Sequence, residues 1–131
     1  MSTLFLEVFP VGPIQANCIL LGDVEAGELV VIDPGEEAER IAERVRESGL
    51  RPTMILHTHG HLDHVGGTAE LSVLLGGDVP VGLHSGDIEL YRSAPVQARM
   101  FGLEVDAPPE PGLMFEHGQS IPVGGLELEV R

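Results

Sequence analysis

The chain has 131 residues, of which 43% are hydrophobic and 21% are charged, so its composition is that of a folded domain rather than a disordered chain. Its 21 acidic residues against seven basic residues give a formal net charge of −14, which predicts that nucleic acid is not a partner, because phosphate binding requires clusters of lysine or arginine. No signal peptide and no apolar run of about 18 residues is present, so we expect a cytoplasmic protein without a membrane partner. The single cysteine, Cys18, precedes an apolar run and is predicted to be a buried thiol.

The first part of the chain predicts three strands and a helix. The strands are expected at residues 4–9, 18–21 and 29–32. In the segment 36–48, apolar residues recur at i, i+3, i+4 and i+7, which is typical of one buried helical face. Gly49 is the predicted end of that helix.

The second part alternates strands and helices, as α/β proteins do. We expect strands at residues 54–56 and 79–83, helices at 65–75, 85–91 and 95–101, a proline-rich loop at 106–112, and a hairpin of 121–123 with 126–130. In the last strand apolar residues alternate with glutamates, which predicts one buried and one exposed face. The predicted fold class is therefore α/β, with a functional site where a strand ends.

Four of the six histidines and an aspartate lie between residues 57 and 64. His59 and His61 are two residues apart on an extended segment, so both rings point to one side. Asp63 is placed to be the N-cap of the helix 65–75, next to His64. Imidazole nitrogens and carboxylate oxygens are favoured ligands of zinc and iron, so these two pairs predict a site for two neighbouring ions.

Three other histidines have less specific surroundings. His57 adjoins an apolar strand, where a buried, hydrogen-bonded role is favoured over ligation. A helix-cap or packing role is expected for His84, and an exposed turn for His117.

Glycines at positions 60, 66 and 67 would let the backbone approach an ion or a substrate without an intervening Cβ. Arg92 and Arg99 are expected to be solvated surface arginines, so the substrate-binding residues are unknown.

At this point the residues match a family. The segment THGHLDHVGG (residues 58–67) resembles the T-H-x-H-x-D-H-x-G-G signature of the metallo-beta-lactamase superfamily. The segments GPIQANC (12–18) and VIDPG (31–35) resemble early strands of its glyoxalase II-like, or hydroxyacylglutathione hydrolase-like, branch. The resemblance implies an αββα sandwich, of which residues 1–131 form a single incomplete domain, mainly the N-terminal half. The family's third histidine, bridging aspartate and last histidine would follow Arg131.

The resemblance also implies roles for particular residues. His59 and His61 would bind the first metal, and Asp63 with His64 the second, with two zinc ions per complete site and iron or manganese as alternatives. Asp63 would in addition act in catalysis, by orienting a bridging hydroxide and assisting proton transfer. Asp33 resembles an aspartate that supports the metal-binding loop through hydrogen bonds. An ordinary turn aspartate before Pro-Gly explains the same residue equally well.

The implied activity is attack of a metal-bound hydroxide on a thioester or similar acyl bond of a small molecule, such as a glutathione thioester. One alternative is a mononuclear iron persulfide dioxygenase of the same fold. The other is a truncated metal-binding fragment without catalysis. Such a fragment would leave an apolar sheet face uncovered, which favours self-association.

Overall fold

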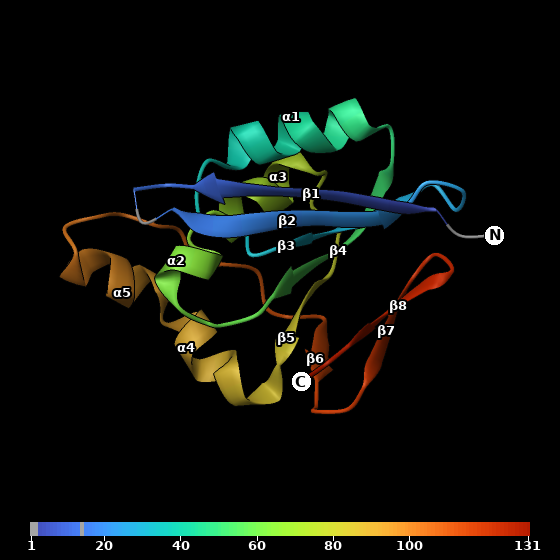
Figure 1. Ribbon diagram of the computed structural model, residues 1–131. Coiled ribbons are helices and arrows are strands. Elements are labelled where there is room, and N and C mark those ends of the chain that lie inside the picture. The colour runs from blue at the N-terminus through green and yellow to red at the C-terminus, as the bar shows by residue number, and fades with distance from the viewer. Residues whose placement is uncertain (1–2, 14) are drawn as a thin grey trace.

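The computed structural model describes residues 3–13 and 15–131, so the first two residues of the chain and residue 14 within the segment 12–18 lie outside it. A six-stranded sheet forms the centre, with the strands side by side in chain order (Figure 1). The antiparallel part pairs β1 with β2 and β2 with β3, and the parallel part runs from β3 to β6. The strands are Leu4–Val11 (β1), Ala16–Asp23 (β2), Glu28–Ile32 (β3), Arg51–His57 (β4), Val81–His84 (β5) and Leu113–Phe115 (β6).

Helices cover one face of this sheet (Figure 1). The helix α1 buries the apolar stripe that its sequence predicts, and it ends at Gly49, whose φ of 71° is the left-handed conformation that glycine adopts most easily. The helices are Ala38–Ser48 (α1), Leu62–Val65 (α2), Thr68–Leu74 (α3), Ile88–Arg92 (α4) and Ala94–Met100 (α5), with a 3₁₀ turn at Ser85–Asp87 (η1). No helix among the described residues is both long and apolar enough to cross a membrane.

A two-stranded hairpin, Ser120–Val123 (β7) and Leu126–Glu129 (β8), packs on the opposite face of the sheet. Ile121 and Val123 join a second core cluster with residues of β3 and β4. In β8 the expected alternation is present, although its apolar side chains are half-buried rather than fully buried. The hairpin therefore covers the middle of the sheet on this face.

On the hairpin side of the sheet, the apolar side chains of β1 are exposed. Leu4, Leu6 and Val8 point away from the helices, and each has more than half of its surface exposed. Self-association through these side chains stays a prediction.

Asp23 fastens the hairpin to the sheet. Its buried carboxylate accepts a hydrogen bond from the backbone N–H of Gly125 at 2.8 Å, and its other oxygen accepts one from Glu25 N–H at 3.1 Å. The Gly124 backbone packs so closely on Asp23 that a Cβ there would lie 2.8 Å from the aspartate side chain. The predicted hairpin is thus confirmed, and its turn is held by a residue about a hundred positions earlier in the chain.

Two predictions about the helices are wrong. The expected helix over residues 65–75 is two helices, α2 and α3, separated at Gly66-Gly67. The residue at the N-cap of α2 is His61, and Asp63 lies inside the first turn, so Asp63 is not an N-cap. The cause of the break is a contact distant in sequence, because Gly67 N–H donates to the carbonyl of Pro34 at 2.9 Å.

Cys18 is fully buried in β2, as expected. Burial, with a smaller contribution from the Asp33 carboxylate, raises the pKa of its thiol from 9.0 to about 12. Above pH 9 the unfolded chain loses this proton while the folded chain keeps it, so stability must fall as the pH rises. At about pH 10.5, we expect the shifted pKa of Cys18 alone to lower the unfolding free energy by about 2 kcal/mol relative to its value below pH 9.

Urea denaturation of the wild-type chain and of Cys18→Ala between pH 8 and about pH 10.5 measures this cost. The wild-type stability should decline more steeply than that of the variant, which has no thiol to titrate. Parallel declines in the two proteins would contradict the assignment.

Candidate metal centre

The four predicted metal ligands lie together at one end of β4. This strand runs parallel to its neighbours β3 and β5, and the loop 58–61, here called the metal loop, follows directly. His59 and His61 extend from the metal loop into solvent, whereas Asp63 and His64 are half-buried in α2. The backbone thus brings all four side chains to the carboxyl end of a central strand, where α/β proteins place their sites.

Distances within the group are short. The ring centroids of His59 and His64 are 4.9 Å apart, and those of His59 and His61 are 6.0 Å apart. The Oδ2 atom of Asp63 lies 3.3 Å from Nε2 of His64. Three imidazoles and one carboxylate are a donor set that suits zinc or iron.

The arrangement is nevertheless open. Across residues 3–13 and 15–131, no three histidine, cysteine, aspartate or glutamate side chains converge closely enough to hold an ion. The chemistry of the four donor side chains therefore fits a metal ion. In this conformation, however, the side chains lie near one another without forming a coordination shell.

Asp33 connects the metal loop to His64. Its buried carboxylate accepts hydrogen bonds from the backbone N–H of Thr58 at 2.8 Å and from the Thr58 hydroxyl. Nδ1 of His64 lies 3.0 Å from Oδ2 of Asp33, although it is not aligned as a hydrogen bond. Asp33 adopts a φ of 56°, a conformation that is costly for a residue with a side chain. The surrounding contacts must hold this residue in place, so it is more than an exposed turn aspartate.

The glycines around the centre are crowded by protein backbone. A Cβ on Gly35 would lie 1.8 Å from the carbonyl oxygen of Asp63, and one on Gly66 would lie 2.5 Å from that of Gly35. A Cβ on Gly60 would meet the carbonyl oxygen of Asp87 at 2.7 Å, and one on Gly67 would meet that of Pro34 at 2.6 Å. These glycines therefore let segments of the protein backbone pack closely together. The sequence analysis expected them to make room for an ion or a substrate, but the atoms that a Cβ would meet belong to the protein itself.

The remaining histidines take the roles favoured for them. His57 is buried, and its Nε2 lies 2.7 Å from the hydroxyl of Thr68. Burial lowers the pKa of His57 to about 4, so its ring is neutral at physiological pH. His84 caps η1 by accepting a hydrogen bond from Gly86 N–H at 2.9 Å, and His117 is exposed in a turn. Thr68 begins α3, and its contact with His57 was not predicted from the sequence. The only local feature that marks Thr68 is its position directly after two glycines.

The comparison with known proteins agrees with this geometry. The metallo-beta-lactamase superfamily model matches residues 11–131. This chain belongs to the metallo-beta-lactamase superfamily. The predicted family, its α/β fold and the likeness to glyoxalase II-type hydrolases are thereby confirmed.

Three similar proteins illustrate the match. The chain is 37% identical over 126 residues to the hydroxyacylglutathione hydrolase GloC of Haemophilus influenzae, covering 95% of this chain and 58% of that protein. The crystal structure of TTHA1623 in a di-iron-bound form is 40% identical with a TM-score of 0.74, covering 88% of this chain and 56% of that one. The structure of the B3 metallo-beta-lactamase BLEG-1 is 26% identical with a TM-score of 0.80, covering 95% and 59%. The chain thus spans less than two thirds of the length of each of these three proteins.

Proposed function

We propose that this chain carries the metal-binding residues of a hydrolase that cleaves a thioester or similar acyl bond of a small molecule. The observation that carries the proposal is the gathering of His59, His61, Asp63 and His64 at the end of β4, with Asp33 behind them. The similarity to a hydroxyacylglutathione hydrolase supports a glutathione thioester as the substrate.

The four side chains would hold the metal, with His59 and His61 on one ion and Asp63 and His64 on another. Two zinc ions are proposed, and the di-iron form of TTHA1623 supports a dinuclear site with iron as an alternative. A bound divalent ion supplies a water nucleophile near neutral pH by lowering the pKa of that water. Asp63 would accept a proton beside His64, while Asp33 would keep Thr58 and His64 in place.

The test is metal content by elemental mass spectrometry together with hydrolysis of a hydroxyacylglutathione thioester. We compare the zinc-loaded wild-type chain with His59→Ala and with His117→Ala, which makes the same change in an exposed turn. About two ions per chain and thioester cleavage are expected for the wild type and for His117→Ala. His59→Ala should lose metal and cleave the thioester at least about tenfold more slowly.

Equal metal content in the wild type and His59→Ala would refute the ligand assignment. Metal binding without thioester cleavage would refute the hydrolase, and oxygen consumption with glutathione persulfide would then identify the dioxygenase alternative. If none of these activities appears while metal is bound, the chain is a metal-binding fragment without catalysis.

A further inference from the structure

His57 and Thr68 stand directly before and directly after the residues that carry the candidate metal ligands. His57 is the last residue of β4, and Thr68 is the first residue of α3. The residues between them, 58–67, include all four candidate ligands, and we call them the ligand segment. A contact between His57 and Thr68 therefore joins the two ends of the ligand segment.

That contact is a hydrogen bond in the protein interior. Nε2 of His57 lies 2.7 Å from the hydroxyl oxygen of Thr68, and both side chains are buried. The ring of Tyr91 packs edge to face against the imidazole, with the ring centroids 5.3 Å apart and an interplanar angle of 64°. The imidazole is thus held in the orientation in which it reaches Thr68.

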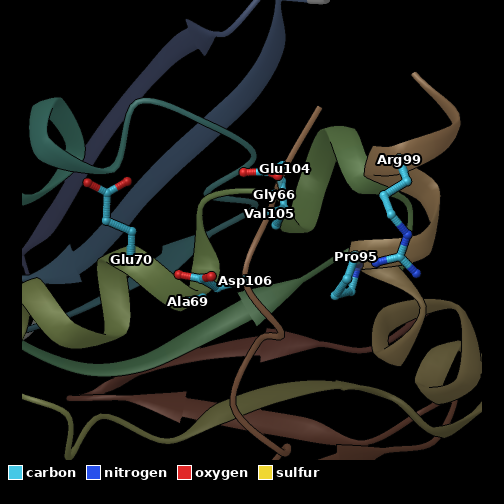
Figure 2. Close-up of a pocket in the computed structure, with 8 residues that line it drawn as sticks. All are labelled: Gly66, Ala69, Glu70, Pro95, Arg99, Glu104, Val105 and Asp106. Atoms are coloured by element: carbon cyan, nitrogen blue, oxygen red, sulfur yellow. The ribbon is translucent and has the colours of Figure 1, made fainter. Parts of the chain in front are cut away.

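The far end of the ligand segment is open on one side. A cavity of about 470 Å³ adjoins Gly66, which lies at the junction of α2 and α3. Figure 2 shows this junction together with the other residues that line the cavity, which come from α3, α5 and the segment 104–106. The junction of the two helices therefore borders open space on this side, and its position depends more on the contacts that it makes elsewhere.

A polar pair is not required to fill this part of the core. Replacing both members of a buried hydrogen bond with apolar groups of similar shape is often nearly neutral for stability. The pair instead adds direction, because a hydrogen bond holds its two atoms at a set distance and angle, whereas apolar contacts allow small shifts. Direction matters here, since a shift of the far end of the ligand segment would move Asp63 and His64 relative to His59.

We propose that His57 and Thr68 are positioning residues of the metal centre, an inference that rests on the proposed metal-binding function. Their hydrogen bond closes the ligand segment into a loop and sets the spacing between its two pairs of ligands. Neither side chain is itself a ligand in this arrangement, because each acts through the backbone that carries the ligands. Loss of the bond should therefore weaken metal binding even where the chain stays folded.

The experiment compares variants at these two positions with the wild type. Thr68→Val removes the hydroxyl and keeps the shape of the side chain, whereas Thr68→Ser keeps the hydroxyl. A double variant with His57→Leu and Thr68→Val makes the pair apolar and removes the buried ring nitrogens. Thr53→Val is the matched control, because the Thr53 hydroxyl donates to the carbonyl of Leu29 at 3.3 Å near the opposite end of β4.

The full chain of each variant is assayed for zinc affinity, stability and local opening. Competition with a chromogenic chelator gives the zinc dissociation constant, and urea denaturation gives the stability. Hydrogen exchange of the metal-free chain follows Val65 and Gly66, whose N–H groups donate to the carbonyls of His61 and Leu62 at 3.1 and 2.7 Å. Val30, which is buried in β3, serves as the internal reference for global unfolding.

We expect Thr68→Val to raise the zinc dissociation constant about tenfold, as the loss of a residue that orients metal ligands predicts. Exchange at Val65 and Gly66 should become about fivefold faster relative to Val30, because one hydrogen bond no longer opposes local opening. Thr68→Ser and Thr53→Val should both resemble the wild type. The double variant should regain a denaturation midpoint near that of the wild type and still bind zinc as weakly as Thr68→Val.

Equal zinc affinity in the wild type and Thr68→Val would overturn the inference, and so would recovery of zinc affinity together with stability in the double variant. Zinc binding that depends on Thr68 without any thioester hydrolysis would support the positioning role and count against the proposed reaction. If the wild-type chain bound no zinc, the proposed function would fail at its metal site, and the exchange rates would decide the inference. Equal exchange at Val65 in the wild type and Thr68→Val would then overturn it, and faster exchange in the variant would support it.

Discussion

Replacing Gly35 with alanine is expected to destabilise the chain by roughly 3 kcal/mol or more, because the added Cβ collides with backbone that has no room to move. The new atom would lie 1.8 Å from the Asp63 carbonyl oxygen and 2.7 Å from its carbonyl carbon. A flexible side chain could rotate away from such a contact, but the first turn of α2 must shift as a whole. The midpoint of urea denaturation, measured by circular dichroism, gives the loss of stability.

Gly112→Ala is the matched control for this substitution. A Cβ at Gly112 meets only Pro80, at an ordinary contact distance of 3.6 Å. Its denaturation midpoint should stay within about 0.5 kcal/mol of the wild type. If Gly35→Ala denatured at the same urea concentration as Gly112→Ala, the close packing of the segment 33–35 against α2 would be disproved.

Replacing Asp33 with alanine is expected to lower the unfolding free energy by about 3 kcal/mol, since it leaves the Thr58 N–H and hydroxyl without their acceptor. Alanine also tolerates the φ of 56° poorly. Asparagine keeps one acceptor oxygen and adopts this conformation more readily, so Asp33→Asn should lose only about 1 kcal/mol.

Zinc affinity should follow the same order in a competition assay with a chromogenic chelator. The proposed support of the metal loop predicts a loss of about ten- to a hundredfold in Asp33→Ala. The Asp33→Asn variant should lie between Asp33→Ala and the wild type. Unchanged stability and zinc affinity in Asp33→Ala would show that Asp33 is an ordinary turn residue.

Sequence patterns predicted those parts of the fold that depend on interactions between residues close together in the chain. The helix α1 was predictable because its apolar spacing and Gly49 act within a few residues. Strand lengths were underestimated, as in β1, because pairing with β2 extends the strand to Val11, beyond its apolar run. The three-residue strand β6 was missed for a related reason, since only its pairing with β5 makes it a strand.

The candidate site shows the same division. His59, His61, Asp63 and His64 are near one another in the sequence, so a single segment suggested them as a group. The contacts of Asp33 with Thr58, 25 residues away, and its left-handed backbone depend on the folded sheet. Within the predicted helix 65–75, the sequence contains Gly66 and Gly67, where the observed break occurs. It does not reveal that the carbonyl of Pro34 accepts a hydrogen bond from Gly67 at this break.

The hydrogen bond between Asp23 and Gly125 spans 102 positions of the chain, and this separation orders the events of folding. An isolated two-stranded hairpin is barely stable in water, so β7 and β8 depend on the sheet for a surface to pack on. The entropy of closing so long a loop is lost before any hairpin contact compensates for it, which makes docking of the hairpin a late step. By the same reasoning it is among the first units to open, and its amide hydrogens should exchange with solvent sooner than those of β3 and β4.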